Sequence, residues 1–376
     1  MENRPIDLNT APQPVTAPAA PPATDGFVFR TRAGVAYELP MFLPVYQPRN
    51  AIFQLAAWQN DPPIEGIIVN AYFLFKQREL RTMLAATGSL KDFVGFHGLI
   101  TTDSGAFQGF TRTLYLSNKD IVKFQDAIGS DVISPLDLVT PPGDRRTIAV
   151  EKLKATEKRV AEGLRLVQRG ILAGVQQGGR FFDLRHASIC RLMEMNVQYV
   201  AIGSLVPFFT NNHDLSFPAA VLTDARHQAG PSIPIHVYGA GDPCELPFMA
   251  ACGATIFDSS SYGHYADGGW YMTPYGALNH TGPIVAGEFA CGCSVCRETP
   301  IDQVFADVAL LARHNLWTIC DTVARLRPLV RTPSALDKYL ENVLAIHEKW
   351  FPQSKLGPSW RAFRDGRPPS VDSPAT

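Results

Sequence analysis

Residues 98–105 read GLITTDSG, a short apolar run that leads directly into an acid, a hydroxyl residue and a glycine. Similar apolar runs recur along the chain, separated by polar or glycine-bearing turns and by segments with helical spacing. The predicted strands are Met41–Val45, Gly66–Val69, Gly98–Thr101, Asp131–Pro135, Ile171–Val175, Tyr199–Ile202, Ile233–Val237 and Thr255–Phe257. Helical spacing is clearest at Lys119–Ile128, Arg145–Gln168, Leu184–Met195 and Pro243–Cys252.

This alternation predicts an α/β protein with parallel strands, because parallel neighbours need a crossover connection. Eight strands with intervening helices predict a (β/α)8 barrel. A doubly wound open sheet is the alternative, but it requires a glycine-rich phosphate turn after an early strand, and the sequence has none.

Composition divides the chain into four predicted regions. Residues 1–25 are rich in Pro, Ala and Thr and predict a disordered tail, because they have little apolar surface to bury. Residues 26–284 are predicted to form the barrel, and residues 285–332 a zinc-binding subdomain packed on it. Residues 333–376 are predicted to form a helical or irregular C-terminal tail.

Charge, cysteine content and hydropathy limit the classes of protein. The formal net charge is −1, so a nucleic acid would have to be held by a local basic patch. Seven cysteines do not form a disulfide framework, because three of them crowd into one short segment. No apolar run reaches the ~18 residues that span a bilayer, and no secretory pattern opens the chain. We therefore expect a cytoplasmic protein without membrane contact.

Polar residues follow the predicted strands at a common register. They include Asp103-Ser104-Gly105, Asp137, Gln176-Gln177, Gly203-Ser204, Tyr238-Gly239 and Asp258-Ser259. In a barrel these positions converge on the carboxyl end of the strands, where active sites are built. Helix capping explains any single one of them, but it does not explain why acids, amides and an aromatic recur at one end.

These segments together resemble the tRNA-guanine transglycosylase family over roughly residues 40–330. The matching motifs are Thr102–Gln108 (TDSGAFQ), Pro135-Leu136-Asp137 with Pro141-Pro142, Gln177-Gly178-Gly179 with Asp183-Leu184-Arg185, His236–Gly241 (HVYGAG), Phe257–Tyr262 (FDSSSY), Cys291–Cys296 (CGCSVC) and His314–Trp317 (HNLW). The YMTP stretch at 271–274 and the HNLW stretch are most similar to the archaeosine-type branch.

The resemblance implies a pentosyltransferase that replaces guanine in tRNA by a 7-deazaguanine through a covalent aspartyl-nucleoside intermediate. It implies that Asp258 is the nucleophile and Asp103 the general acid/base. The implied substrate-binding residues are Ser104, Phe107, Asp137, Gln177, Gly203, Ser204, Leu205, Tyr238 and Gly239. Among these, Phe107 and Tyr238 would sandwich the base, and Asp137 would read its edge. Packing of both aromatics in the core is the alternative.

The resemblance also implies the incoming base and a departure from the family pattern. The archaeosine-type branch implies the nitrile-bearing base preQ0, and the amino form stays open. The family has Gly-Gly where this chain has Gly203-Ser204, which places a side chain beside the predicted base edge. The exchange itself requires no redox or nucleotide cofactor, because both the leaving and the entering groups are bases.

Cys291, Cys293 and Cys296 form a C-x-C-x2-C pattern that predicts a Zn²⁺ site, since closely spaced thiolates repel one another unless a cation neutralises them. His314 is the expected fourth ligand, with His280 and Cys320 as alternatives. Four protein ligands leave no open coordination position, so we expect this zinc to be structural.

The polymer and the partners stay open at this stage. The basic residues Arg325, Arg327, Arg331, Lys355, Arg361, Arg364 and Arg367 with Trp360 suit phosphate contact and stacking, or form a plain charged tail. Archaeosine-type enzymes usually carry further C-terminal RNA-binding domains, and only about 60 residues follow HNLW here. This favours DNA as an alternative polymer, or a tRNA enzyme that relies on the barrel alone.

Two other functions are conceivable for this sequence. A non-catalytic partner subunit is the third hypothesis, although the three acids argue against it. A generic barrel hydrolase explains neither the cysteines nor the ordered motifs. The family resemblance further implies a homodimer.

Overall fold

The computed structural model describes residues 26–48, 61–106 and 116–366. Parallel strands form its central sheet, in the order β7-β6-β5-β4-β3-β11-β10-β9-β8. Their bounds are β3 Met41–Tyr46, β4 Gly66–Asn70, β5 Leu99–Asp103, β6 Val132–Ile133, β7 Ile171–Leu172, β8 Gly174–Gln176, β9 Val200–Ile202, β10 Ile235–Val237 and β11 Ile256–Ser259. The predicted strands are therefore present, most of them shifted by one or two residues at an end.

The sheet closes into a barrel because β7 and β8 are two halves of one predicted strand, separated by Ala173. On one side, the Ala173 N–H donates to Ile133 O at 2.9 Å. On the other side, the Gly174 N–H donates to Tyr199 O at 2.8 Å. One stretch of chain thus pairs with β6 and with β9, which confirms the (β/α)8 barrel and excludes the open-sheet alternative.

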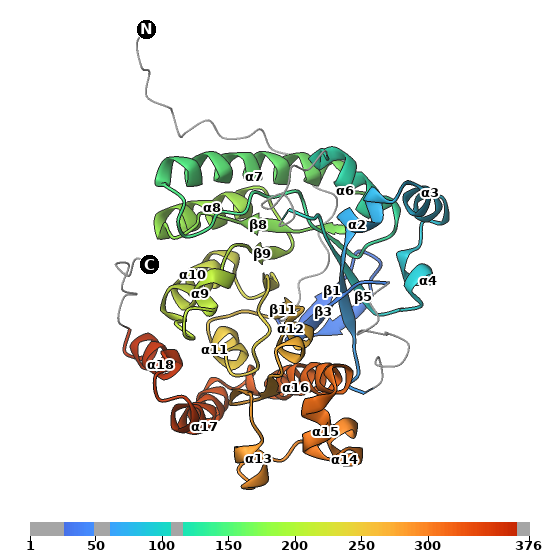
Figure 1. Cartoon of the computed structure of the whole chain (residues 1–376). Helices are drawn as coiled ribbons and strands as arrows, with labels where there is room; N and C mark the ends of the chain where they lie inside the picture. The colour runs from blue at the N-terminus through green and yellow to red at the C-terminus, as the bar shows by residue number, and fades with distance from the viewer. Residues whose placement is uncertain (1–25, 49–60, 107–115, 367–376) are drawn as a thin grey trace.

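Helices surround the barrel (Figure 1). Their bounds are α2 Ala71–Lys76, α3 Arg78–Thr87, α4 Leu90–Val94, α6 Asn118–Ala127, α7 Arg146–Leu166, α8 Phe182–Glu194, α9 Val206–Phe209, α10 Ser216–Ala229, α11 Leu246–Ala251 and α12 Ser261–Asp267. Strand residues alternate between the two sides of the barrel wall. Met41 and Leu43 belong to the interior cluster, whereas Phe42 packs in the outer layer with the helices.

A two-stranded hairpin, β1 Val28–Arg30 and β2 Ala36–Glu38, precedes the barrel and was not predicted. Its Phe29 is 4% exposed and belongs to the barrel's interior cluster, with its ring edge-on to Tyr199 at 5.6 Å between centroids. The hairpin therefore completes the barrel core.

The C-terminal third adds a second hairpin and further helices. They are β12 Tyr271–Thr273, β13 Gly276–Leu278, α13 Gly282–Val285, α14 Ser294–Glu298, α15 Ile301–Ala306, α16 Val308–Leu329, α17 Pro333–Trp350 and α18 Leu356–Arg364. Helix α16 contacts α12 and β3, α17 contacts α11, and α18 contacts α10. In Figure 1, α16 and α17 lie on the side of the barrel opposite α7 and α8. No helix in the described ranges has the length and hydropathy of a bilayer-crossing segment.

Candidate functional site at the carboxyl end of the barrel

Three acids lie at the carboxyl ends of the barrel strands. Asp103 is the last residue of β5, Asp137 follows β6, and Asp258 is in β11. The charges of Asp137 and Asp258 both act on the Asp103 carboxyl group and raise its pKa. The same three carboxylates also act on the Tyr238 hydroxyl, which follows β10. Four separate strands therefore bring these side chains together.

Asp258 is 7% exposed and is anchored through one carboxylate oxygen. Its Oδ1 accepts hydrogen bonds from His236 Nε2 at 2.7 Å and from the Gly239 N–H at 3.3 Å. The other ring nitrogen of His236 lies 2.8 Å from the Tyr199 hydroxyl. A neutral imidazole that accepts from Tyr199 and donates to Asp258 satisfies all three groups. Within the described ranges both of these hydrogen bonds fall on Oδ1, so Oδ2 is the oxygen that can meet a ligand.

Asp103 is held by two donors. Asn70 Nδ2 donates to its Oδ2 at 2.9 Å, and the Gly105 N–H donates to its Oδ1 at 3.2 Å. Removal from water raises the pKa of Asp103 to about 7, the Gly105 N–H opposes the shift, and the neighbouring carboxylates add to it. A carboxyl group that titrates near neutrality can both donate and accept a proton at physiological pH.

Asp137 and Gln177 form a buried polar pair. Gln177 Nε2 donates to Asp137 Oδ2 at 2.6 Å. Burial raises the pKa of Asp137 to about 6, against the opposing effects of the Gln177 hydrogen bond and the Arg159 charge. Among the described residues, Gln177 Oε1 and the buried Ser104 Oγ have no hydrogen-bond partner. Unpartnered buried polar atoms beside these acids suit contact with a polar ligand.

The Gly203-Ser204 step lies against this pair. A Cβ on Gly203 would come within 2.4 Å of Gln177 Nε2, so any side chain there would displace the amide that bonds Asp137. Ser204 adopts a left-handed conformation with φ +59°, and its Oγ accepts a hydrogen bond from the Thr140 N–H at 2.9 Å. The side chain that departs from the family pattern is thus engaged with the loop after β6. Leu205 is fully buried.

Tyr238 and Phe107 were predicted to sandwich a base. The Tyr238 hydroxyl lies 2.7 Å from Ser134 Oγ, and its ring meets the His236 ring at 79° with 4.8 Å between centroids. Burial raises the pKa of Tyr238 well above its usual value, so the hydroxyl stays protonated. Phe107 lies outside the described residues, and the sandwich stays a prediction.

Sequence reasoning missed a layer of residues that hold the site in place: Asn70, Ser134, Arg185, Tyr199 and His236. Arg185 is fully buried in α8, and its guanidinium donates to the carbonyl oxygens of Gly179 at 3.0 Å and Gly203 at 2.7 Å. His236 lies in the HVYGAG motif, and Arg185 ends the Asp183-Leu184-Arg185 motif. These motifs were the sequence signal that could have identified the two residues. Side-chain direction, which the sequence does not give, determines their roles.

The predicted metal ligands form a compact cluster. One ligand atom from each of Cys291, Cys293, Cys296 and His314 lies within 4.8 Å of the others. His314 Nδ1 is 3.4, 3.5 and 3.4 Å from the three sulfur atoms in chain order, and its Nε2 lies 2.8 Å from Met272 O. The carbonyl of Met272 orients the ring so that Nδ1 faces the thiols. These residues can hold a metal ion, and His314 is the fourth member.

The C-terminal basic residues are largely engaged within the chain. Their partners are Arg325–Asp321, Arg327–Glu65, Arg331–Glu38, Lys355–Asp214, Arg361–Glu348 and Arg364–Asp337. Trp360 is 3% exposed and packs against Phe248, so the prediction that it stacks on a nucleic acid is wrong. Arg367 lies outside the described residues.

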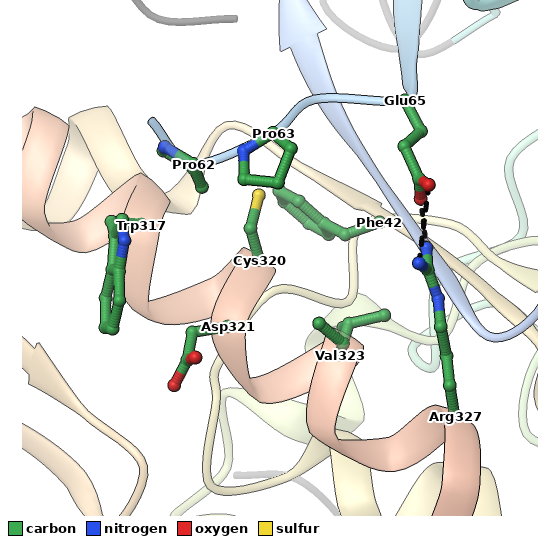
Figure 2. Close-up of a pocket in the computed structure, with 10 residues that line it drawn as sticks. Phe42, Pro62, Pro63, Glu65, Trp317, Cys320, Asp321, Val323 and Arg327 are labelled. Atoms are coloured by element: carbon green, nitrogen blue, oxygen red, sulfur yellow. Dashed lines mark hydrogen bonds and ion pairs between the residues drawn. The ribbon is translucent and has the colours of Figure 1, made fainter. Parts of the chain in front are cut away.

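A surface hollow lies beside α16, away from the carboxyl end of the barrel. Figure 2 shows Cys320 of α16 with its sulfur toward Pro63, and Arg327 of the same helix paired to Glu65. These residues precede β4 or lie on α16, and none of the three acids lines the hollow. We therefore place the chemistry at the barrel acids.

Comparison with known proteins identifies the family of this chain. The model of the family described as queuine tRNA-ribosyltransferase matches residues 28–349. The tRNA-guanine(15) transglycosylase of Pyrococcus abyssi is 33% identical over 307 residues, which cover 79% of this chain and 51% of that protein. Its counterparts from Methanosarcina mazei and Haloarcula marismortui are 30% and 32% identical, over 82% and 81% of this chain and 62% and 63% of their own lengths.

The chain therefore spans between half and two thirds of the length of these relatives. Because the family model covers nearly the whole described structure, the chain belongs to the queuine tRNA-ribosyltransferase family.

Proposed function

We propose that this chain exchanges guanine in tRNA for a 7-deazaguanine base, with preQ0 as the incoming base. The observation that carries the proposal is the proximity of Asp103, Asp137 and Asp258 at the carboxyl ends of the strands, where all three charges act on the Tyr238 hydroxyl. The relatives' names, which describe guanine exchange at a tRNA position, support the reaction class and the polymer.

In the proposed first half-reaction, Asp258 Oδ2 attacks C1′ of the target nucleotide while the bond from C1′ to N9 of guanine breaks. Asp103, protonated in part near neutral pH, gives its proton to the departing guanine. The His236 hydrogen bond keeps Asp258 Oδ1 occupied, so that Oδ2 faces the sugar. The products of this step are free guanine and an ester between Asp258 and the sugar.

In the second half-reaction, the Asp103 carboxylate removes a proton from the incoming base. The freed ring nitrogen then attacks C1′ and displaces the Asp258 carboxylate. Each proton that Asp103 gives up in the first half is thus recovered in the second, and no redox cofactor takes part. The same two acids serve both directions, as microscopic reversibility requires.

Base recognition is assigned to Asp137, Gln177 and Ser104. The Asp137 carboxylate can accept from the exocyclic amine and a ring N–H, a pattern that guanine and 7-deazaguanines share. The unpartnered Gln177 Oε1 and Ser104 Oγ supply further polar contacts. Tyr238 and Phe107 are proposed to stack on the base, and Gly203 to Leu205 and Gly239 to contact it through the backbone.

Zn²⁺ is the proposed occupant of the cluster formed by Cys291, Cys293, Cys296 and His314. Three sulfur donors and one imidazole are a ligand set that Zn²⁺ prefers, and four protein ligands complete its tetrahedron. When bound, the ion would neutralise the thiolates and cross-link α14, α16 and the segment before α14. Its proposed role is structural. A homodimer is also proposed from the family resemblance.

The direct test is incorporation of labelled preQ0 into purified tRNA and, in parallel, into duplex DNA. We expect label in tRNA with the wild-type chain and none with Asp258→Asn. Label in DNA alone would keep the chemistry and change the polymer. Label in neither, with the chain folded and zinc-loaded, would overturn the proposed function and favour a non-catalytic subunit. Nucleoside mass spectrometry of tRNA and DNA from cells with and without the gene identifies the modified base.

A further inference from the structure

A second group of metal-ligating side chains shares no residue with the three acids or with the Cys₃His cluster. A ring nitrogen of His213, a carboxylate oxygen of Asp242 and Cys244 Sγ all lie within 4.8 Å of one another. His213 is in the turn between α9 and α10, and the other two residues are in the loop between β10 and α11. None of the three belongs to the proposed catalytic or base-binding set.

A buried carboxylate fixes the His213 ring. His213 Nδ1 lies 2.7 Å from Glu245 Oε1, and Glu245 is only 3% exposed. In metal sites a carboxylate commonly takes the N–H of a ligand histidine, which fixes the tautomer and leaves the other nitrogen for the ion. Here the Glu245 bond occupies Nδ1, which leaves Nε2 to bind an ion once its own proton is released. His213 itself adopts φ +57°, a conformation that is uncommon for a residue other than glycine.

The remaining two ligands are also positioned by the fold. Asp242 is 8% exposed, and its two oxygens accept from the Cys244 N–H and the Tyr265 hydroxyl, both at 3.2 Å. Each carboxylate oxygen keeps a second lone pair after these bonds. Cys244 is fully buried and forms no disulfide. The nearby His347 ring is excluded as a ligand, because both its nitrogens bond elsewhere, to Tyr275 O and Ser354 Oγ.

Charge balance favours a cation at this position. Asp242 and Glu245 place two carboxylates in a buried volume, where uncompensated negative charge is costly. The charges that act on the Glu245 carboxyl group are those of Asp242 and His213. His213 is the basic side chain in contact with the two buried acids, and when protonated it supplies one charge against two.

We propose that His213, Asp242 and Cys244 bind one divalent transition-metal ion, with Zn²⁺ as the best match. A set of one imidazole, one thiolate and one carboxylate suits Zn²⁺, whereas Mg²⁺ and Ca²⁺ prefer oxygen ligands alone. Binding releases the Cys244 thiol proton and the Nε2 proton of His213 to solvent, and the metal forms bonds to the sulfur, the ring nitrogen and an Asp242 oxygen. The ion joins the turn before α10 to the loop that carries Tyr238 and Gly239, so it would stiffen one wall of the barrel mouth.

The test is metal content of the full chain, loaded with Zn²⁺ or Co²⁺, desalted and measured by inductively coupled plasma mass spectrometry. Cys244→Ser and His213→Ala should each bind one metal equivalent fewer than the wild type. Cys293→Ser should lose only the ion of the Cys₃His cluster and keep the ion bound by His213, Asp242 and Cys244. Cys252→Ser, which changes another buried thiol beside α11, should retain the full wild-type content. In the Co²⁺ form, the charge-transfer absorption of a single thiolate should disappear in Cys244→Ser.

Unchanged metal content in both Cys244→Ser and His213→Ala would overturn the proposal, as would a wild-type equivalent that disappears only in Cys293→Ser. Circular dichroism of each variant at the assay temperature shows whether it is folded. If His213→Ala unfolds, Cys244→Ser still decides, because serine differs from cysteine by one atom and keeps the loop's backbone bonds. These readouts do not depend on transglycosylase activity, so this inference and the proposed function can fail separately.

Discussion

Asp258 illustrates how one side chain is prepared for covalent chemistry. Its Oδ1 is held by His236 and the Gly239 backbone, and His236 is held in turn by Tyr199. This chain of hydrogen bonds fixes the plane of the Asp258 carboxylate. A carboxylate fixed in this way loses little conformational freedom when it attacks the sugar.

Asp258→Asn is expected to reduce base exchange by on the order of 1,000-fold or more, about 4 kcal/mol in the activation barrier. The amide keeps an Oδ1 acceptor for His236 but cannot form the ester with the sugar. The melting temperature should therefore stay close to that of the wild type. Steady-state exchange of labelled guanine measures the loss, and retention of full activity would remove the assigned nucleophile.

Asp103 makes stability depend on pH. Burial raises its pKa from 3.8 to about 7 in the folded chain, so the folded state holds a proton that the unfolded state releases. Between these two pKa values, stability falls as pH rises, because the unfolded state binds fewer protons. An acid whose pKa is lowered by folding has the opposite effect, because it makes the free energy of unfolding rise with pH.

Asp103→Asn cannot ionise, so its melting temperature relative to the wild type should increase between about pH 5 and about pH 8. Comparing the two proteins across this range cancels the other titrating groups. A difference that is flat with pH would show that Asp103 is not held in its raised-pKa environment. Exchange activity should be lost in the variant at every pH.

At the scale of elements, Arg185 joins the loops that follow two neighbouring strands. From α8 its guanidinium donates to the carbonyls of Gly179, in the loop after β8, and of Gly203, in the loop after β9. Both loops supply residues to the proposed base-binding recess. Burial lowers the pKa of Arg185 to about 9, yet the group still carries its charge at neutral pH.

Arg185→Met is expected to lower the free energy of unfolding by about 3 kcal/mol or more, because it leaves several buried carbonyl groups without donors. The substrate KM should also rise, since the two loops lose their common tie. Arg180→Met is the matched control. Arg180 is exposed and packs over Phe181, so its loss should cost no more than about 1 kcal/mol. Urea denaturation compares the two variants.

The cysteine cluster holds short elements that have little core of their own. Helix α14 is five residues long and follows a segment without regular structure. Cys293→Ser should remove the bound zinc and lower the free energy of unfolding by more than about 3 kcal/mol. Zinc content and the melting temperature are measured on the same sample. A melting temperature unchanged from the wild type, with no zinc in either protein, would contradict the proposed site.

At the scale of the whole molecule, the C-terminal helices are packed against the barrel. Helix α18 contacts α10, and its Trp360 lies edge-on to Phe248 of α11, with 5.2 Å between ring centroids. Residues 333–366 therefore add to the apolar core rather than lying free. The predicted domain boundaries at 284 and 332 stay predictions, because packing alone does not show where a folding unit ends.

Trp360→Ala should destabilise the chain by about 3–5 kcal/mol, since it opens a cavity among large aromatic side chains. Trp270→Ala is the control. Trp270 is 38% exposed, and truncating it should cost clearly less. Guanidinium denaturation followed by circular dichroism gives both values. Equal stabilities of the two variants would mean that α18 does not contribute to the cooperative fold.

The sequence by itself determined the strand and helix alternation, and with it the barrel. Apolar runs such as Ile171–Val175 have few ways to bury both faces except inside a closed parallel sheet. It also determined the cysteine cluster, because the spacing of Cys291, Cys293 and Cys296 is local and forces the thiols together. Local spacing and periodicity are properties that a linear chain displays directly.

Only the tertiary structure decided which side chains support the site. His236 faces Asp258, and Arg185 faces two loop carbonyls. His213 lies close to Asp242, although the two residues are in different loops. Trp360 was predicted to stack on a nucleic acid, yet it is buried against Phe248. Such pairings depend on where distant elements meet and on the direction of each side chain, and no local pattern in the sequence encodes either.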